Sequence, residues 1–523
     1  MPDPYYVTTA ISYPNGPPHI GHAYEAIAAD VVARFRRQCG HRVRFQTGTD
    51  EHGLKMARKA EERGMTARAL ADEMSGLFRT MCDELNITYD RFIRTVDADH
   101  HRASQALWRA MEERGDLYLD RYEGWYSVRD EAYYDASELG DNEAGEKLSP
   151  QGTPVEWTVE ESWFFRLARY QDKLIALLET PGFLEPESRR NEMLSFVRGG
   201  LRDLSISRTS FDWGVAVPGD DGHVMYVWVD ALTNYLTGLG YPDNTDDMAA
   251  FWPADLHLIG KDIVRFHAVY WPAFLMSANL PMPKQVFGHG FLLNRGRKES
   301  KSLGNVTDPV ALAQQFGVDQ LRYFLMREVA FGQDGSYSEA AIVTRCNAEL
   351  ANSFGNLAQR TLSMIYKNVD GVLSAELHTQ PMDDALAAKV REECNALREA
   401  FEKLAFSDGL EAWMRAVFAC NQYVDDTAPW ALRKTDPGRM ETVLMVLFKM
   451  VRDLAIAVLP VVPNAGNMLL DQMGIPASAR SYADLSDNSW YEKRVATGVP
   501  LEKPVGAFPR LDEPTNEAEG ATC

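Results

Sequence analysis

Two histidines stand three residues apart near the start of the chain, in the segment Tyr13-Pro-Asn-Gly-Pro-Pro-His19-Ile-Gly21-His22. We predict that this segment connects a β-strand to the first turn of a helix, where backbone N–H groups and the helix dipole favour a phosphate. There the two imidazoles could donate hydrogen bonds to a phosphate whose charge grows in a transition state. Gly21 would let a nucleotide approach the backbone closely. The plainer alternative is a helix N-terminus with two exposed histidines.

Two lysines stand three residues apart much later in the chain, in Lys298-Glu-Ser-Lys301-Ser302-Leu-Gly304-Asn305. Ammonium groups on flexible stems suit a clamp that neutralises a leaving pyrophosphate. Taken alone, such a loop is more often simply solvated surface. Together, the histidine pair and the lysine pair favour an enzyme that activates a substrate with a nucleotide.

The segments around these motifs follow an α/β pattern, in which strand, loop, helix and strand form one βαβ unit of a parallel sheet. The first predicted unit comprises a strand at 6–10, a helix at 19–39 and a strand at 43–47. The second comprises a strand at 256–259, a helix at 262–276 and a strand at 286–287. Between them, residues 118–225 contain short β-like runs at 124–128 and 155–159. We therefore predict a nucleotide-binding sheet that is split by a connective insert.

The last third of the chain is predicted to be helical. Leu397, Phe401 and Leu404 would line one helix face, and a second face would consist of Val443, Leu447, Met450 and Leu454. The predicted organisation is a catalytic domain in two halves (1–117 and 226–325), the insert (118–225), a linker (326–350), a helical bundle (351–505) and a tail (506–523).

Composition restricts the class of protein further. The 523 residues include 54 Lys and Arg against 75 Asp and Glu, a net charge of −21. This acidity disfavours broad affinity for nucleic acid, although a local basic path would still suffice. No apolar run approaches the roughly 20 residues of a membrane span, and the N-terminus has no secretory signal pattern. We expect a cytoplasmic protein without a membrane segment.

The two motifs resemble those of the class I aminoacyl-tRNA synthetases. His19-Ile20-Gly21-His22 matches the HIGH motif of that family, and Lys298-Glu299-Ser300-Lys301-Ser302 matches KMSKS except for Glu299. Other stretches resemble the methionyl-tRNA synthetase family: Thr47-Gly-Thr-Asp50-Glu-His52-Gly, Phe92-Ile-Arg94-Thr, Tyr226-Val-Trp228-Val-Asp230-Ala231-Leu-Thr-Asn-Tyr235 and Gly260-Lys261-Asp262-Ile263-Val-Arg-Phe-His267. The resemblance runs from about residue 5 to 470 and implies a Rossmann-type α/β catalytic domain followed by an all-α anticodon-binding bundle.

The resemblance also implies the site residues. Catalysis would fall to His19, His22, Lys298 and Lys301. ATP would contact Gly21, His22, Glu25, Gly260, Lys261, Asp262, His289, Gly290 and Lys301. The methionine pocket would be lined by Ala10, Ile11, Tyr13, Asp50, Trp228, Ala231, Leu232, Tyr235, Ile263, Phe266 and His267. Of these, Asp50 would hold the α-ammonium, and Tyr235 and His267 would lie near the thioether.

The same resemblance implies partners and cofactors. The reaction would use L-methionine, ATP and Mg²⁺, and tRNA(Met) would be read by Asn356, Arg360 and Trp430, with the indole stacking on an anticodon base. Many relatives carry cysteine-based zinc knuckles in the insert, but this sequence has no cysteine between Cys82 and Cys346. Ser127, Asp130 and Ser149 stand where ligands are expected, and serine is a poor zinc ligand, so we predict an insert without zinc.

Several rival functions are less consistent with the sequence. A synthetase for valine, isoleucine or leucine needs a large editing domain, and the 108-residue insert offers little room. A cysteine enzyme would need a zinc site. A small-molecule adenylyltransferase would not need the helical third, and a tRNA-binding protein without catalysis would not need both motifs. Since no dimerisation module follows the bundle, we expect a monomer.

Overall fold

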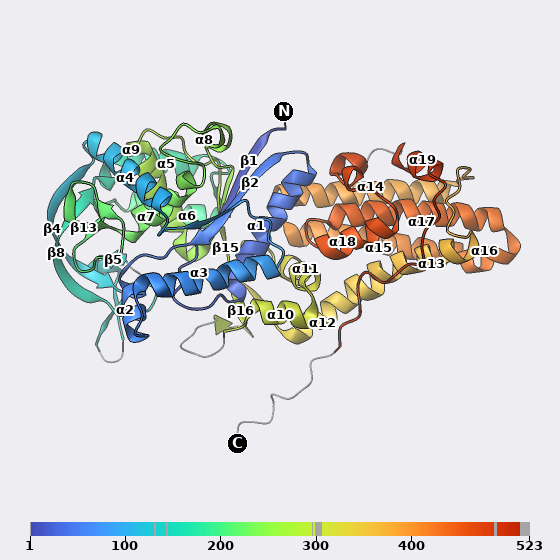
Figure 1. The fold of residues 1–523 in the computed structure, drawn as a ribbon, viewed down its shortest axis with the longest axis horizontal. Helices are drawn as coiled ribbons and strands as arrows, with labels where there is room; N and C mark the ends of the chain where they lie inside the picture. Colours follow the sequence, from blue (N-terminus) through green and yellow to red (C-terminus); the bar gives the residue numbers. More distant parts are fainter. Residues whose placement is uncertain are drawn as a thin grey trace, which may run out of the picture.

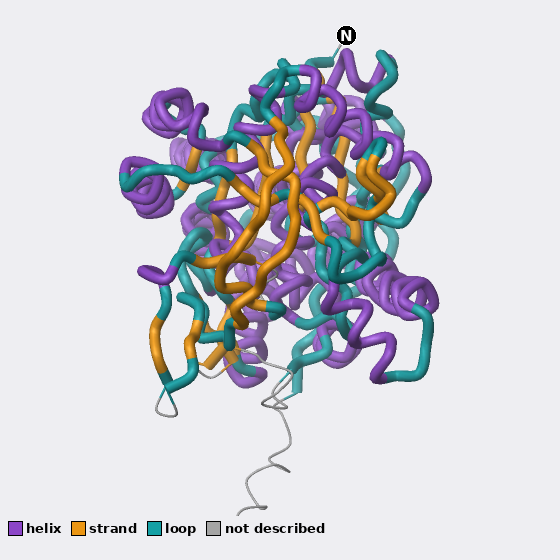
Figure 2. Tube along the Cα trace, turned by 90° about the vertical axis from the view of Figure 1, so that its left-hand side faces the viewer, coloured by secondary structure: helices purple, strands orange, loops and turns teal. Residues whose placement is uncertain are grey.

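The computed structural model describes residues 2–129, 132–142, 145–294, 297–298, 306–485 and 489–512. Its centre is a six-stranded parallel sheet (Figures 1 and 2). In sheet order the strands are β3 (Arg91–Arg94), β2 (Arg42–Thr49), β1 (Pro4–Thr9), β14 (Leu256–Gly260), β15 (Val286–His289) and β9 (Leu184–Glu185). Strand order reverses direction at β1, between β2 and β14. In sheets of this kind, ligands bind beyond the carboxyl ends of the strands at that point.

Both predicted βαβ units are present, with a difference in the second. Helix α1 (Ile20–Gln38) connects β1 to β2, close to the predicted bounds. The predicted helix at 262–276 is instead a short 3₁₀ turn (Lys261–Ile263), a π-helical segment (Phe266–Tyr270) and α9 (Trp271–Ser277). Pro272 has no N–H to donate, so an unbroken α-helix could not be fully hydrogen-bonded there.

The insert consists mainly of a long antiparallel hairpin, drawn at the end of the molecule farthest from the bundle in Figure 1. Strands β4 (Leu117–Ser127) and β8 (Glu156–Phe165) extend well beyond the two predicted runs. Helices α5 (Gln171–Glu179) and α6 (Glu187–Arg198) follow, and β9 between them pairs with β15. The interval 118–225 therefore contributes an edge strand to the main sheet, a pairing too short to leave a sequence signal. The smaller strands are β5 (Ala132–Tyr134), β6 (Gly140–Asp141), β7 (Lys147–Leu148), β10 (Leu204–Ser205), β11 (Ser207–Arg208), β12 (Ala216–Val217) and β13 (Asp220–Met225).

Helices pack on the sheet and lead into the bundle. Those of the catalytic part are α2 (Leu54–Glu62), α3 (Ala67–Glu84), α4 (Ala98–Glu113), α7 (Val227–Thr237) and α8 (Asp246–Phe251). The small strands β16 (Leu292–Asn294) and β17 (Arg297–Lys298) are followed by the connecting helices α10 (Pro309–Phe316) and α11 (Val318–Glu328). Strand β18 (Gly335–Tyr337) and helix α12 (Glu339–Cys346) come next. No helix among the described residues is long and apolar enough to cross a membrane.

The helical third is an elongated bundle beside the catalytic part (Figure 1). Its helices are α13 (Asn356–Asn368), α14 (Pro381–Glu402), α15 (Phe406–Thr427), α16 (Pro429–Thr435), α17 (Pro437–Val458), α18 (Pro463–Gln472) and α19 (Ser489–Ala496). The predicted face of α17 is buried as expected. Leu404 is also buried, but it lies beyond the end of α14 with a φ of 59°, where the chain turns towards α15. One hydrophobic core extends from the sheet through α1 into the bundle.

Candidate active site

The histidine motif forms the N-terminus of α1. His19 is the N-cap, and its Nδ1 accepts a hydrogen bond from the Gly21 N–H at 3.1 Å. In return, Nδ1 of His22 accepts from the His19 N–H at 3.1 Å. Because both Nδ1 atoms are acceptors, each ring carries its proton on Nε2. The two rings lie 3.8 Å apart between centroids and line one cleft. The arrangement presents two N–H donors at a helix N-terminus, as binding of a phosphate requires.

Gly21 has a specific reason to lack a side chain. A Cβ at this position would lie 2.9 Å from Cε1 of His19. Any larger residue would therefore displace the His19 imidazole. Close approach of a nucleotide to this glycine stays a prediction.

The two lysines of the second motif fall at the limit of the described structure. The backbone of Lys298 ends β17 and pairs with Leu293 of β16. Lys301 lies outside the described residues, as does Asp130 of the insert. Val306, which follows this loop, lines the same cleft as His19 and His22.

Glu25, one turn beyond His22, is held by two strands. Its Oε1 accepts from the Ala10 N–H at 3.0 Å, and its Oε2 accepts from Nε2 of His289 at 2.8 Å. The Nδ1–H of His289 donates to the Gly290 carbonyl at 2.8 Å. Burial alone would lower the pKa of His289, but the hydrogen bond and charge of Glu25 raise it. Glu25 and His289 therefore form an ion pair that ties β1 and α1 to the end of β15.

Glycine is required at position 290 by packing. A Cβ there would lie 2.2 Å from the Gln333 carbonyl oxygen. At the end of β14, Gly260 precedes Lys261, whose Nζ donates to both carboxylate oxygens of Asp334 at 2.7 Å. Asp262 is exposed and lines the cleft. Of these predicted ATP contacts, Lys261 is thus already engaged by an aspartate.

The predicted methionine residues on α7 and the π-helical segment come together as an aromatic cluster. Trp228 stacks on Phe266 with 3.8 Å between centroids and 5° between planes. The Tyr235 hydroxyl lies 2.7 Å from Nε2 of His267, whose Nδ1 lies 3.0 Å from the Ile263 carbonyl oxygen. Burial lowers the pKa of His267 to about 4, so the ring is neutral at pH 7. Its Nδ1–H therefore donates to Ile263, and its Nε2 accepts the Tyr235 proton.

The remaining predicted methionine contacts surround this cluster. Ala231 and Leu232 are buried on α7. Asp50 follows β2, is only 7% exposed, and its N–H donates to the Ser12 carbonyl at 2.9 Å. The Tyr13 hydroxyl accepts from the Met56 N–H at 3.0 Å, and Ile11 is partly exposed. Ala10 and Asp50 follow adjacent strands at the crevice where strand order reverses.

One cleft of about 1920 Å³ connects the paired histidines of α1 with the aromatic cluster. Its lining includes His19 and His22 from α1 and Phe266 from the methionine cluster. The far wall is the insert hairpin, where Trp125 and Trp157 meet edge to face at 5.4 Å. The space can therefore hold a nucleotide and an amino acid side by side, with room left towards the hairpin.

Hydroxyl groups stand at positions of the insert where zinc ligands are expected. Ser127 and Ser149 each hydrogen-bond to Oγ1 of Thr153, at 2.7 and 2.8 Å. Ser, Thr and their backbone neighbours do not fit the thiolate and imidazole ligands of a structural zinc. Across the described ranges, His, Cys, Asp and Glu form no group of three that could hold a metal ion.

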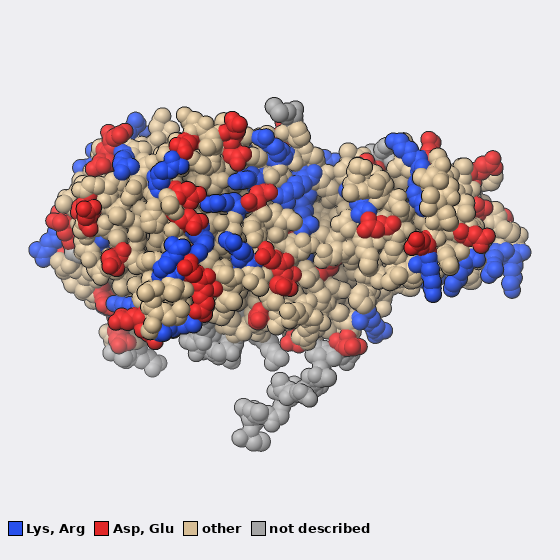
Figure 3. All heavy atoms as spheres, viewed as in Figure 1, with Lys and Arg blue, Asp and Glu red and all other residues tan. Residues whose placement is uncertain are grey.

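The predicted anticodon residues lie at the far end of the bundle. The Arg360 guanidinium is 5.4 Å from the centroid of the Trp430 ring, and Trp430 is 49% exposed, which excludes a core role. Asn356 is exposed at the start of α13, one turn before Arg360. Lysine and arginine side chains gather at this end of the bundle (Figure 3), including exposed Arg433 and Lys434 of α16. The acidic chain thus presents a local basic surface beside an exposed indole.

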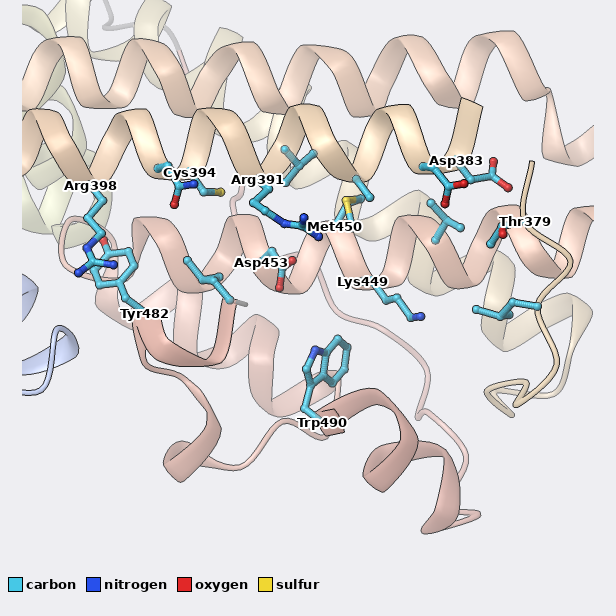
Figure 4. Close-up of a pocket in the computed structure, with 17 residues that line it drawn as sticks. Thr379, Asp383, Arg391, Cys394, Arg398, Lys449, Met450, Asp453, Tyr482 and Trp490 are labelled. Carbon is cyan, nitrogen blue, oxygen red and sulfur yellow. The ribbon is translucent and has the colours of Figure 1, made fainter. Parts of the chain in front are cut away.

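A separate cavity of about 340 Å³ lies in the bundle between α14, α17, the turn at Tyr482–Leu485 and the start of α19 (Figure 4). Arg391, Lys449, Asp453 and Trp490 line it, and burial raises the pKa of Asp453 to about 6. None of the predicted site residues lines this cavity.

Sequence reasoning missed the polar groups behind the cleft. Asp230 is fully buried and hydrogen-bonded to both His52 and His100. Asp230 and His52 lie inside stretches that matched the synthetase family, but no role was assigned to them. His100 lies in the first turn of α4, in an Asp-His-His run that matches none of the motifs considered above.

The fold and the cleft define a class I tRNA synthetase, and comparison with known proteins agrees. The family model for class I tRNA synthetases (M) matches residues 5–362, and the model for the anticodon binding domain of methionyl tRNA ligase matches residues 375–519. The chain belongs to the methionyl branch of the class I tRNA synthetase family.

Individual relatives match over nearly their whole length. The chain is 56% identical over 510 residues to the methionine--tRNA ligase of Brucella suis, covering 97% of this chain and 98% of that one. It is 54% identical over 513 residues to that of Rhizobium meliloti, covering 98% and 99%. Among solved structures, Mycobacterium tuberculosis methionyl-tRNA synthetase in complex with methionyl-adenylate has a TM-score of 0.93 at 54% identity, covering 97% and 100%. The apo form of that protein has a TM-score of 0.87 at 51% identity, covering 98% and 99%.

Proposed function

We propose that this protein is a methionine--tRNA ligase. It joins L-methionine to ATP, forming methionyl-adenylate and releasing pyrophosphate, and then transfers methionine to the 3′-terminal adenosine of tRNA(Met). The observation that carries this proposal is the single cleft lined both by the paired histidines of α1 and by Phe266 of the aromatic cluster. An amino acid held at the cluster would direct its carboxylate towards a phosphate held at α1.

The first step needs no nucleophile from the enzyme. The methionine carboxylate attacks the α-phosphate in line, so catalysis depends on positioning and on stabilisation of developing charge. The Nε2–H groups of His19 and His22 would donate to phosphate oxygens. Lys298 and Lys301 would neutralise the leaving pyrophosphate. Mg²⁺, where bound with ATP, would supply positive charge that offsets the charge of the phosphates.

The aromatic cluster explains a preference for methionine. The Tyr235 hydroxyl proton is engaged by His267, so selection of the thioether would rest on ring packing and shape, to which sulfur is well suited. A neutral His267 places no charge beside the apolar side chain. Asp50 would bind the α-ammonium with a charge-assisted hydrogen bond.

Further residues would contact the nucleotide and the tRNA. Gly21, Gly260, Asp262 and Gly290 would border the adenosine, while Glu25 and His289 would hold the strand ends around it. At the other end of the molecule, Trp430, Arg360 and Asn356 would read the anticodon. We expect the enzyme to act as a monomer.

The test is exchange of labelled pyrophosphate into ATP, measured with each of the twenty amino acids in turn. We expect exchange with methionine far above the other nineteen, and then charging of tRNA(Met) but not of a tRNA with another anticodon. Exchange that depends on a different amino acid, or on none, would contradict the proposal.

A further inference from the structure

Three buried side chains from separate segments meet behind the methionine cluster. Asp230 of α7 accepts from Nδ1 of His52, which follows β2, and from Nε2 of His100, which lies on α4; both distances are 2.6 Å. The side chains of Asp230 and His100 are fully buried, and that of His52 is 3% exposed. A single carboxylate thus joins the end of a sheet strand to two helices.

We propose that Asp230, acting through His52 and His100, is a positioning residue that sets the distance between the ammonium end and the side-chain end of the methionine site. The inference rests on the proposed function, because it assumes that Asp50 and Trp228 bind the two ends of methionine. It assigns Asp230 no contact with the substrate.

The hydrogen bonds fix the direction of each proton. The Thr237 hydroxyl donates to the Thr233 carbonyl at 3.1 Å, so its oxygen accepts from Nδ1–H of His100 at 3.0 Å. Nε2–H of His100 donates to Asp230, and the Ser104 hydroxyl lies 3.3 Å from the same nitrogen. Burial would raise the pKa of Asp230, but His52 and His100 hold it well below its usual range. The carboxylate is ionised, and it is the common acceptor of both rings.

The loop that carries Asp50 is fixed at each neighbouring residue. Thr49 donates to the Glu51 carboxylate at 2.6 Å, and Arg94 donates to both Glu51 oxygens at 2.8 and 2.7 Å. The Glu51 carbonyl accepts from Nε1 of Trp213 at 2.6 Å. The next residue, His52, is held by its hydrogen bond to Asp230. Because of these bonds, Asp50 cannot move independently of α7.

Helix α7 carries the other end of the site on its opposite side. Trp228, Ala231 and Tyr235 recur at i, i+3 and i+7, which places them on one helix face. Asp230 and Thr237 share the face that meets α4 through His100. A shift at Asp230 would therefore change the span between Asp50 and Trp228, and methionine must bridge that span.

Exchanging amides for the two imidazoles tests this geometry. The side-chain nitrogen of asparagine lies as many bonds from Cα as histidine Nδ1 does, and that of glutamine as many as Nε2. His52→Asn and His100→Gln therefore retain the donor to Asp230, whereas His52→Gln and His100→Asn misplace it. The opposite preference at the two positions separates a positioning role from simple packing.

The readout is the KM for methionine and for ATP in pyrophosphate exchange. We expect His52→Gln and His100→Asn to raise the KM for methionine at least tenfold while the KM for ATP changes less than twofold. His52→Asn and His100→Gln should recover most of that loss. Equal effects of asparagine and glutamine at both positions, or equal changes in both KM values, would overturn the proposal.

Thermal unfolding of each variant provides the control for folding. If all four variants fail to fold, the network is only structural and the proposal falls. Failure of the proposed function is distinguishable, because the unmodified protein would then show no methionine-dependent exchange at all.

Discussion

Truncation of Trp430 would separate recognition of tRNA from the chemistry of activation. The indole lies on α16 at the end of the bundle, 49% exposed and 5.4 Å from the Arg360 guanidinium. Ala428, at the junction of α15 and α16, has a φ of 43°, and this turn directs α16 away from the preceding helix. Trp430→Ala should therefore remove a stacking surface without opening a hole in the core.

The size of the effect follows from the exposed area. A tryptophan side chain offers up to about 250 Å², so half exposure leaves roughly 120 Å² for a base. Covering that area at about 25 cal/mol/Å² gives about 3 kcal/mol as an upper limit. Stacking of one base on an aromatic ring is worth about 1–3 kcal/mol. Since about 1.4 kcal/mol is a factor of ten, this range corresponds to a fall in aminoacylation of about fivefold to more than a hundredfold.

The assay compares two half-reactions of the same variant. Methionine-dependent pyrophosphate exchange involves no tRNA and should stay within twofold of the unmodified protein. Trp430→Phe should recover much of the aminoacylation, because a phenyl ring still stacks. Phe418→Ala, which removes another exposed aromatic of the bundle from α15, should have little effect. Parallel loss of both half-reactions with lowered thermal stability would refute the reasoning, and so would a variant with unchanged aminoacylation.

Three further outcomes are expected. Lys301→Ala should slow adenylate formation by a factor equivalent to about 3–4 kcal/mol while methionine binding is preserved, and an unchanged activation rate in rapid kinetics would contradict this. Elemental analysis should find no stoichiometric zinc, because Ser127 and Ser149 bond to a threonine in the insert; one tightly bound zinc per chain would disprove it. The pKa of Asp453 is raised from its ordinary value to about 6, so its ionisation should reduce the free energy of unfolding as pH rises from about 4 to 6. Asp453→Asn should lose that dependence, by up to about 3 kcal/mol, and an unaltered pH profile of unfolding would exclude the role.

Local patterns predicted the elements but not their exact partners. The strand around Phe45 and helix α1 were evident from β-rich and apolar periodicity, and α17 from its buried face. The two-residue pairing of β9 with β15 was not predictable, because so short a strand has no periodicity. The interruption of the predicted helix at Pro272 could have been anticipated from the missing N–H of proline. The π-helical segment that contains Phe266 could not.

The same contrast applies to the site. The histidine motif was recognisable because its chemistry lies in consecutive residues. Other contacts at the site, such as that between Glu25 and His289, join positions 264 apart, and sequence spacing holds no information about such contacts. Asp230 is similar: its two histidine partners lie 178 and 130 residues away. Motifs made of consecutive residues were thus easier to recognise than contacts between distant positions.

Helix α1 links the histidine end of the cleft to the helical bundle. Its first turn carries the histidines, and Asp30 further along accepts from Arg322 of α11 and from Arg34, both at 2.6 Å. Arg322, fully buried, also donates to the Val461 carbonyl at 3.0 Å, between α17 and α18. Gln38 at the end of α1 donates to the Ile456 carbonyl at 2.7 Å.

A helix of 19 residues is about 28 Å long and stiff over that length. The position of the bundle relative to the paired histidines is therefore set by one rigid element and a buried ion pair, rather than by the connecting helices alone. Breaking a buried pair by removing one partner costs about 3–5 kcal/mol, because the other charge stays buried. The contact between Asp30 and Arg322 thus resists relative movement of the two parts, and we expect the surface at Trp430 to keep a fixed distance from the paired histidines.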